Sequence, residues 1–441
     1  MKRVFSILGV GVLTLTILGY WGLSVGAEDQ VSVTLLIKSG PRYSGAQLAS
    51  LPGFEKKYPN IKVNLAVVSW SEHYEKLPIE LASWSGKYQG APIDYVYIPA
   101  YAAAGYLQPL DQFIFEPKKA IGPDFEFTDG TMEIEDIPFR VRDMYIVNGK
   151  YYAFPHDSNI NEMYWREDVF KENGISAPTD VTWDEVLEIA QKLTQDTNGD
   201  GKIDQYGFVA SFERGVLLAS LFETIFWAYN GKLFDEKFNP MLNTEAGKKA
   251  MQILAESLKY APPGSLTFRT DDVAARTQTG TAVFAPACWG EGMLDKKANP
   301  YADSIGVAGT PKGLPGGKIG VMGGYGYAIF TTATEEQAKA AWLFIEYLQS
   351  KKNAEVYSKA GGQPTRLSSL KKYARFSKDL SVIADGIKVA GIRPPIPELP
   401  QMDEIISDHI SLALAGAKPV LKALEDLDRD LRKMFARFGR Y

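Results

Sequence analysis

Cysteine and histidine are scarce in this chain of 441 residues, and their scarcity excludes several kinds of site. The single cysteine, Cys288, has no partner for an intrachain disulfide and cannot form a four-cysteine zinc site. His73, His156 and His409 stand far apart in the sequence, which argues against a His-rich catalytic metal centre.

An excess of positive charge is also missing. The chain has 48 Lys+Arg against 53 Asp+Glu and a formal net charge of −5, whereas nucleic-acid-binding domains are usually basic. We therefore expect no nucleic-acid partner. With 45% hydrophobic and 23% charged residues, the composition is that of an ordinary globular protein of two or three domains. Aromatic residues are plentiful (23 Tyr, 22 Phe and 8 Trp), and Tyr and Trp suit the walls of a sugar pocket.

The first 27 residues have the three-part layout of a secretory signal peptide. Lys2 and Arg3 precede a largely apolar stretch over 4–23, and Val25-Gly26-Ala27 supplies small residues for cleavage. An uncleaved anchor is the alternative, because the apolar stretch approaches the length of a membrane span. We expect cleavage after Ala27 and a protein that is periplasmic or extracellular.

The next part of the chain alternates strands and helices. Strands are predicted over 31–37, 61–67 and 93–98, with helices over 47–58 and 71–85 between them, so the sequence predicts an α/β sheet with helices on both faces. Thr182 and Glu185 form a capping box that predicts a helix start. Further helices are predicted over 216–229, 244–259, 335–350, 352–360, 402–414 and 418–436, and strands over 281–285, 304–308 and 325–330.

Four segments, in order, carry a resemblance to a known family. They are Asn148–Pro155 running on through Tyr164–Phe170 to Thr182–Glu185, then Gly280–Trp289, then the glycine-rich 320–326 leading into Ala338–Leu348, and finally Pro395–Met402. On these segments the chain resembles the extracellular solute-binding proteins of ABC importers, in particular the carbohydrate-binding group that includes maltose-binding protein.

The resemblance implies the type II periplasmic-binding-protein fold, in which two α/β lobes are joined by a hinge and bind ligand in the cleft between them. It implies an N-terminal lobe of residues 28–157 and 310–335, and a C-terminal lobe of residues 158–309 and 336–441. The chain is then expected to cross between the lobes near 157–160, 307–311 and 334–340.

The resemblance also implies a function without catalysis. The protein is expected to be a monomer that captures a carbohydrate, from a monosaccharide or polyol to an oligosaccharide, and delivers it to the transmembrane subunits of an ABC permease. No cofactor is required. Where the maltose-binding relative has aromatic residues after its Pro-Gln-Met, this chain has Asp403–Ser407, which predicts a ligand smaller than a malto-oligosaccharide.

A sugar site needs aromatic platforms and hydrogen-bonding partners on loops that follow strands. Arg42 and Tyr43 follow the first predicted strand, Trp70 follows the second, and Tyr97 ends the third. Trp70 could instead pack at the start of the next helix.

Further ligand-binding candidates come partly from the resemblance and partly from the glycine-rich turn at 323–326, the tight loop at 361–366 and the apolar helix that ends near Tyr229. Asn159 aligns with a sugar-contacting glutamate of the relative, and Trp289 aligns with the family's stacking tryptophan. The full set of candidates added here is Asp157, Asn159, Tyr229, Trp289, Glu291, Tyr325 and Arg366. The alternatives are hinge caps for Asp157 and Asn159, core packing for Trp289 and Tyr229, and a surface ion pair for Arg366.

Residues 196–204 fit the start of a calcium-binding loop. Asp196, Asn198, Asp200 and Asp204 stand at the positions that supply oxygen ligands, and Lys202 would add its backbone carbonyl. The twelfth position, where a glutamate closes the loop, is Gly207. A structural Ca²⁺ ion is one interpretation, and a hairpin of Asx turns is the other.

Two further classes of function stay open. A secreted glycosidase or lyase needs a pair of catalytic acids, and no local pair stands out. The same fold could instead bind iron, a polyamine or a peptide. Tyr151 and Tyr152 suggest a ferric site, but neighbouring residues of a strand face opposite ways.

Overall fold

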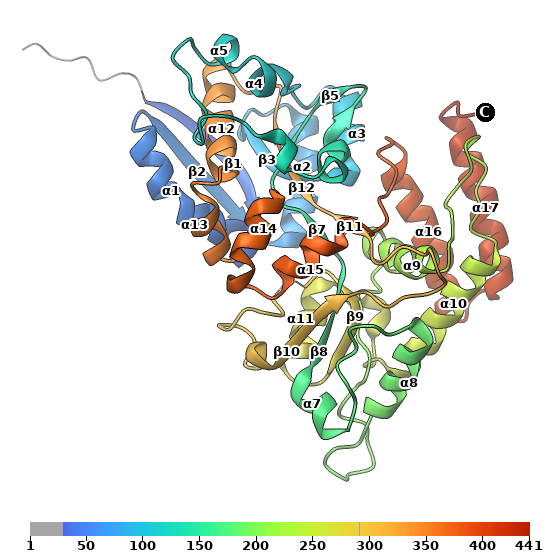
Figure 1. Cartoon of the computed structure of the whole chain (residues 1–441). Coiled ribbons are helices and arrows are strands. Elements are labelled where there is room, and N and C mark those ends of the chain that lie inside the picture. Colours follow the sequence, from blue (N-terminus) through green and yellow to red (C-terminus); the bar gives the residue numbers. More distant parts are fainter. Residues whose placement is uncertain (1–29, 291) are drawn as a thin grey trace, which may run out of the picture.

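The computed structural model describes residues 30–290 and 292–441. The predicted signal peptide and Glu291 lie outside these residues. The described chain forms two lobes, and the first contains the residues before the first crossing together with a later segment that returns to it (Figure 1). In the described part of the chain, no helix is both long and apolar enough to cross a membrane.

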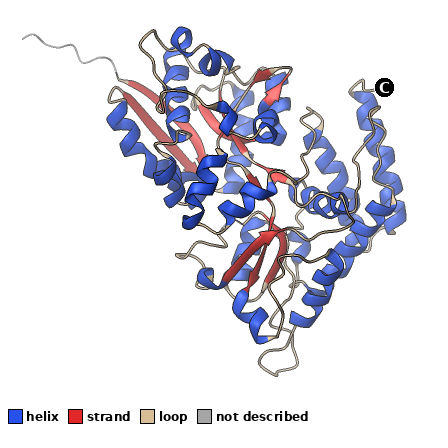
Figure 2. Ribbon diagram, in the orientation of Figure 1, coloured by secondary structure: helices blue, strands red, loops and turns tan. Residues whose placement is uncertain are grey.

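The first lobe is built on a five-stranded sheet of order β2-β1-β3-β12-β6. These strands are β1 (Val31–Lys38), β2 (Ile61–Val68), β3 (Gly90–Asp94), β6 (Phe154–Pro155) and β12 (Tyr325–Ile329). β1 is parallel to β2 and β3, whereas β12 is antiparallel to β3 and β6. The apolar run of β1 is buried because this strand lies inside the sheet with helices packed against it (Figure 2).

Helices α1 (Ala46–Lys57), α2 (Trp70–Ser83) and α12 (Glu335–Leu348) pack on this sheet. The predicted β-α-β-α-β order is confirmed, but the third strand ends earlier than predicted. The chain turns into a short helix over Tyr95–Tyr97, because the Asp94 side chain accepts a hydrogen bond from the Val96 amide at 3.3 Å. The lobe also contains α3 (Ile98–Ala103), α4 (Asp111–Phe115), α5 (Pro117–Ala120), α6 (Phe139–Arg142), β4 (Ile146–Val147), β5 (Lys150–Tyr151), α13 (Ala354–Lys359) and α14 (Leu367–Tyr373).

The second lobe is built on an antiparallel sheet of order β10-β8-β9. Its strands are β8 (Glu162–Arg166), β9 (Phe284–Cys288) and β10 (Ile305–Gly309). Its helices are α7 (Glu167–Glu172), α8 (Trp183–Leu193), α9 (Val216–Ala228), α10 (Glu245–Ser257), α11 (Thr270–Gln278), α15 (Asp379–Gly386), α16 (Leu399–Leu414) and α17 (Val420–Arg437). The capping box predicted at Thr182 and Glu185 is confirmed at the start of α8.

The chain passes between the lobes three times. The first crossing runs through β7 (Asn159–Ile160), where the sequence predicted it, and β11 (Met322–Gly323) returns antiparallel to β7 as the second. The third lies between α14 and α15, because α14 contacts α13 in the first lobe and α15 contacts β10 in the second.

Two predicted boundaries differ from this path. Residues 310–320 lie with the second lobe, since Lys312 exchanges backbone hydrogen bonds with Val181 and Trp183. Residues 336–373 lie with the first lobe, since α12 packs on β1, β2 and β12. The crossings predicted near 307–311 and 334–340 are therefore wrong.

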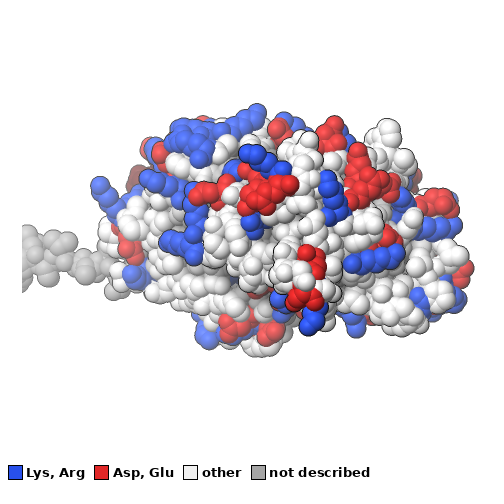
Figure 3. All heavy atoms as spheres, turned by 90° about the horizontal axis from the view of Figure 1, so that it is seen from below, with Lys and Arg blue, Asp and Glu red and all other residues white. Residues whose placement is uncertain are grey.

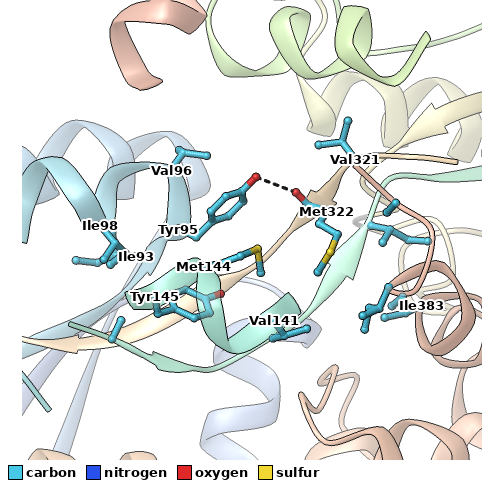
Figure 4. Packing of buried hydrophobic residues seen from close by; sticks show 14 of the residues in the cluster. Ile93, Tyr95, Val96, Ile98, Val141, Met144, Tyr145, Val321, Met322 and Ile383 are labelled. Atoms are coloured by element: carbon cyan, nitrogen blue, oxygen red, sulfur yellow. Dashed lines mark hydrogen bonds between the residues drawn. The ribbon is translucent and has the colours of Figure 1, made fainter. Parts of the chain in front are cut away.

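The crossing strands are anchored to both bodies. Figure 4 shows Tyr95 of the first lobe donating a hydrogen bond from its Oη to the carbonyl of Met322, at 3.2 Å. Tyr145 and Val321 are buried beside these residues. On the face shown in Figure 3, basic and acidic side chains are interspersed, which agrees with the balanced composition.

Candidate functional site

A small hollow lies between the two lobes beside the crossing strands. Its volume is about 50 Å³, which is room for about four water molecules. The lining residues come from both lobes and from the crossings: Arg42, Tyr43, Trp70, Tyr74, Asp94, Asn159, Val216, Leu217, Thr270, Trp289, Gly323, Gly324 and Tyr325. We call this hollow the aromatic cavity.

The first lobe reaches the aromatic cavity with the carboxyl ends of its parallel strands. Arg42 and Tyr43 lie in the turn that follows β1, and Asp94 is the last residue of β3. Trp70 begins α2 directly after β2, where Ser69 and Glu72 form a capping box. Ligands of open α/β sheets bind at this edge, so the topology itself directs these side chains to the cleft.

Aromatic rings form the wall on this side, and the ammonium group of Lys38, which does not itself line the cavity, contacts two of them. The rings of Tyr43 and Tyr325 meet edge to face with centroids 5.6 Å apart, and Trp70 lies 4.4 Å from Tyr74. The Lys38 ammonium, fully buried, is 3.7 Å from the Tyr43 centroid and 3.1 Å from that of Tyr325. Cation–π attraction of this kind holds the two tyrosine rings in place.

A chain of hydroxyl and carboxyl groups runs along the same wall. Tyr74 Oη donates to Asp94 Oδ2 at 2.9 Å and lies 2.7 Å from Tyr325 Oη. Burial raises the pKa of the Asp94 carboxyl, opposed by the hydrogen bond from Tyr74. A ligand hydroxyl entering the cavity would therefore meet groups that are already oriented.

At the first crossing, Asp157 ties several parts of the site together. Its Oδ2 lies 3.0 Å from both Nε and Nη2 of Arg42, and its Oδ1 accepts from the Tyr325 amide at 2.8 Å. Asn159 Nδ2 donates to the same Oδ1 at 3.3 Å. Asp157 is fully buried and does not line the aromatic cavity, so its observed contacts are those of a hinge residue.

The second lobe contributes Trp289, which lies against the returning strand β11. A Cβ at Gly323 would stand 2.6 Å from the Trp289 ring and 2.3 Å from Asn159 Oδ1. Only glycine leaves room for both side chains. Leu217 and Thr270, from the starts of α9 and α11, complete the wall of this lobe.

The structure brings together six of the residues predicted from the sequence. Arg42, Tyr43, Trp70, Asn159, Trp289 and Tyr325 all line the aromatic cavity. Their contact with a ligand stays a prediction, and Glu291 lies outside the described residues.

Besides Asp157, three predicted residues do not line the cavity. Tyr97 packs behind Tyr74, with ring centroids 5.8 Å apart. Tyr229 lies within the second lobe, where burial and then the charge of Asp184 raise its pKa to about 12. The Arg366 guanidinium is buried in the first lobe and donates to the carbonyls of Gln349, Met132 and Glu133, so Arg366 neither lines the aromatic cavity nor lies at the surface.

Sequence reasoning missed Lys38, Tyr74, Asp94 and Thr270. Lys38 and Asp94 end β1 and β3, so the strand-end rule that selected Arg42 applies to them as well. Tyr74 follows Trp70 by four residues and so shares its helix face. Thr270 offered no sequence signal beyond its place at a helix start.

The candidate calcium loop lies in the second lobe and is exposed. Asp196 accepts hydrogen bonds from the amides of Gly199 and Gly201, and Asp200 accepts one from Lys202. Asn198 Oδ1 accepts from the Asp200 amide, so the loop forms Asx turns. Within residues 30–290 and 292–441, no group of three or more Asp, Glu, His or Cys side chains is arranged to hold a metal ion. Calcium binding stays a prediction.

Comparison with known proteins gives consistent matches. A family model described as bacterial extracellular solute-binding protein matches residues 39–355. A probable amino-acid ABC transporter periplasmic-binding protein of Sinorhizobium fredii is 26% identical over 392 residues, which cover 86% of this chain and 84% of that protein.

Two solved structures share the fold. The solute-binding protein of Agrobacterium radiobacter in complex with ribitol has a TM-score of 0.77 at 24% identity, and the match covers 92% of this chain and 99% of that one. Maltose-bound MalE3 of T. maritima has a TM-score of 0.78 at 22% identity, with 92% and 100% covered.

Proposed function

Since this chain belongs to the family of bacterial extracellular solute-binding proteins, we propose that it is the substrate-binding component of an ABC importer for a sugar or polyol. The predicted two-lobed type II fold is confirmed by the structural matches. Three observations support a sugar or polyol as the ligand. The lining of the aromatic cavity suits it, and the two similar structures contain ribitol and maltose. The cavity also lies between two lobes, which in such folds can close on a ligand.

The main observation behind this proposal is that aromatic rings and groups able to bind hydroxyls line the same cavity. Trp70 and Tyr325 of the first lobe lie on one side of the aromatic cavity, and Trp289 of the second lies on the other. Asp94 and Asn159 offer a carboxyl and an amide between them. A sugar has an apolar C–H face and a rim of hydroxyl groups, so it matches both kinds of surface.

An amino acid is the second candidate, because the relative from Sinorhizobium fredii carries that description. An amino acid would need a cation for its carboxylate and an anion for its ammonium group. Arg42 and Asp157, which could have served, are paired with each other, so the cavity favours a neutral ligand. The positive charge of Lys38, buried beside Tyr43 and Tyr325, also disfavours a polyamine. Tyr151, considered for iron, lies on β5 beside Phe115 and does not line the cavity.

The decisive experiment is a melting-temperature screen of the purified protein, followed by calorimetric titration of the hits. The panel contains hexoses, pentitols, hexitols, disaccharides, L-amino acids, putrescine and Fe³⁺. We expect sugars or polyols to raise the melting temperature, with no new product in the NMR spectrum of the ligand. Stabilisation by amino acids, putrescine or Fe³⁺ alone would overturn the proposal, and conversion of a sugar would show an enzyme.

Replacing Trp289 tests the wall of the second lobe. Loss of one stacking ring is expected to weaken sugar binding by about 10- to 100-fold, which corresponds to about 1.4–2.8 kcal/mol. Trp84→Ala is the matched control, because Trp84 is 52% exposed and packs on Tyr106 away from the aromatic cavity. Equal sugar affinities of Trp289→Ala and the control would show that Trp289 does not contact the sugar.

Delivery to a permease follows from the two-lobed design. In the closed state both lobes present a fixed joint surface, and a permease that contacts both can distinguish loaded from empty protein. We expect the protein to act as a monomer, and light scattering after gel filtration will give its mass. ATP hydrolysis by the reconstituted importer should rise when loaded protein is added.

A further inference from the structure

The last helix, α17, carries a basic surface at its far end. The whole chain has a formal net charge of −5, yet residues 431–440 contain Arg432, Lys433, Arg437 and Arg440 and no acidic residue. These residues form the last turns of α17 and the turn that follows it. In Figure 1 this end of α17, beside the label C, lies at the rim of the molecule and far from the crossing strands β7 and β11.

Four basic side chains share the exposed face of this helix. Arg429, Arg432, Lys433 and Arg437 stand three or four residues apart, a spacing that places side chains on one side of an α-helix. All four are exposed. The opposite face is apolar and buried, and it consists of Leu427, Leu431, Met434 and Phe435. The helix is therefore fixed on the second lobe by its apolar face and presents its cations outward.

Acidic neighbours offset only part of this charge. Arg429 and Lys433 form ion pairs with carboxylates of the same helix. Arg432 donates instead to a neutral amide oxygen at 2.7 Å. Among the residues that the structure describes, no carboxylate forms an ion pair with Arg432 or Arg437. The exposed face therefore keeps a positive charge that the fold does not neutralise.

Two exposed aromatic rings stand at the same end. Phe438 is 49% exposed and directly follows α17, and Tyr441 is 55% exposed. The guanidinium carbon of Arg432 lies 6.0 Å from the centroid of the Tyr441 ring. Tyr441 Oη donates to the Phe238 carbonyl at 2.7 Å, which ties the segment after α17 to the second lobe. The name basic patch is used below for the exposed side chains of Arg429, Arg432, Lys433, Arg437, Phe438 and Tyr441.

Such a surface matches a bilayer that contains anionic lipids. Basic side chains near an anionic membrane strengthen binding by about fivefold each, and aromatic rings are stable at the level of the lipid headgroups. Neither contribution needs a shaped pocket, so cations along two turns of a helix suffice. A stable protein partner would need a larger contact with few charges at its core. The mixture of exposed cations and rings therefore favours a lipid surface.

We propose that the basic patch is a membrane-contact surface, by which the protein lies against a bilayer with anionic lipids, with Phe438 and Tyr441 at the level of the headgroups. The contact is weak and reversible, because few cations take part and salt screens them. It goes beyond the proposed function, since it does not depend on the solute in the cleft. A protein held at the bilayer meets a permease by diffusion in two dimensions.

Arg432→Glu combined with Arg437→Glu is the sharpest test, because both arginines are exposed and neither is paired with a carboxylate of the described residues. Lys371→Glu with Lys372→Glu is the matched control. These two lysines are exposed on α14 of the first lobe, and their reversal changes the net charge by the same amount. If circular dichroism shows that the first variant does not fold, Arg432→Gln with Arg437→Gln replaces it.

The measurement is co-sedimentation of the whole protein with vesicles of phosphatidylcholine alone or with an equal amount of phosphatidylglycerol. At about 50 mM NaCl we expect the wild type to partition onto the anionic vesicles at least tenfold more strongly than onto the neutral ones, roughly what two cations contribute. About 500 mM NaCl should abolish the difference. Arg432→Glu with Arg437→Glu should lower partitioning onto the anionic vesicles about tenfold or more, and the control should stay within about threefold of the wild type.

Apolar insertion of any segment acts on both kinds of vesicle, so the ratio of anionic to neutral partitioning isolates the basic patch. Equal partitioning of the wild type onto the two would overturn the proposal. Equal losses in the two double variants would assign the binding to overall charge and would overturn it as well. Sugar titration of the same proteins keeps the two proposals apart, because a wild type that binds vesicles but no sugar or polyol would end the proposed function and leave the membrane contact standing.

Discussion

His73 faces inward from α2, and its imidazole is held neutral by its surroundings. Burial, and then the charge of Lys38, lower its pKa to about 3. In the unfolded chain the same group titrates near 6.5. Between these values the unfolded state binds a proton that the native state does not, so the free energy of unfolding falls as the pH falls below about 6.5.

This difference predicts how His73→Gln changes acid stability. From pH 7 to pH 5 the wild type should lose about 2 kcal/mol of unfolding free energy relative to the variant, because about 1.4 kcal/mol is lost per pH unit. Urea denaturation of both proteins at the two pH values measures it. His156, whose pKa burial lowers to about 4, is present in both proteins, so its contribution cancels. Parallel pH dependences would contradict the assignment to His73.

At the residue scale, the sequence predicted several of the residues that line the cavity, but it misplaced Arg366 and missed Lys38. Tyr43 and Trp70 were found because they follow strands, and strand ends are readable from the hydrophobic pattern. Arg366 was misplaced, because nothing in its neighbourhood shows that three carbonyls more than ten residues away will surround it. Lys38 was missed because a buried lysine is rare, and only the tertiary fold brings the rings of Tyr43 and Tyr325 to it.

At the element scale, the candidate calcium loop offers a clean experiment. Asp200→Asn keeps an oxygen that can accept the hydrogen bond from the Lys202 amide but removes the negative charge that a Ca²⁺ ligand supplies. The spacing predicts that 10 mM CaCl₂ raises the melting temperature of the wild type and not of the variant. An ion bound with a Kd of about 0.1–1 mM would add about 1.4–2.7 kcal/mol.

Magnesium chloride at the same concentration controls for ionic strength. Equal melting curves with and without Ca²⁺ in the wild type would leave the loop as a set of Asx turns.

Local sequence signals predicted where helices and strands lie in the chain, but not which sheet or helix each one packs against. The capping box at Thr182 fixed the start of α8, because its hydrogen bonds connect residues three apart. The place of α12 could not be read in the same way. The pattern of an amphipathic helix shows which of its faces is apolar, but not which sheet will cover that face. α12 packs on the first sheet because the strand before it, β12, belongs to that sheet.

At the scale of the whole molecule, Arg269 links the lobes across the cleft. It precedes α11 in the second lobe and donates from Nη1 to Ser71 Oγ of α2 at 2.8 Å. Its guanidinium carbon lies 5.4 Å from the Trp70 ring centroid, and Nε pairs with Glu213 at 2.9 Å. The contacts with Ser71 and Trp70 exist only while the lobes are close together, whereas Glu213 belongs to the same lobe as Arg269.

Arg269→Ala should therefore shift the ligand-free protein toward an open state. We expect a larger radius of gyration in small-angle scattering and a ligand affinity lower by about 3- to 10-fold, since closure becomes less favourable. Arg276→Ala is the control, because Arg276 lies on the same helix and stacks on Phe268 of its own lobe. An unchanged radius of gyration and affinity would show that Arg269 does not hold the lobes together.

The three crossings have a consequence for how the polypeptide acquires its shape as it emerges from the ribosome. The first sheet needs β12, which ends at Ile329, between β3 and β6. A nascent chain that ends before Tyr325 lacks β12, so one edge of β3 has no strand to pair with. The sheet of the first lobe can therefore not be completed until about three quarters of the polypeptide has been made.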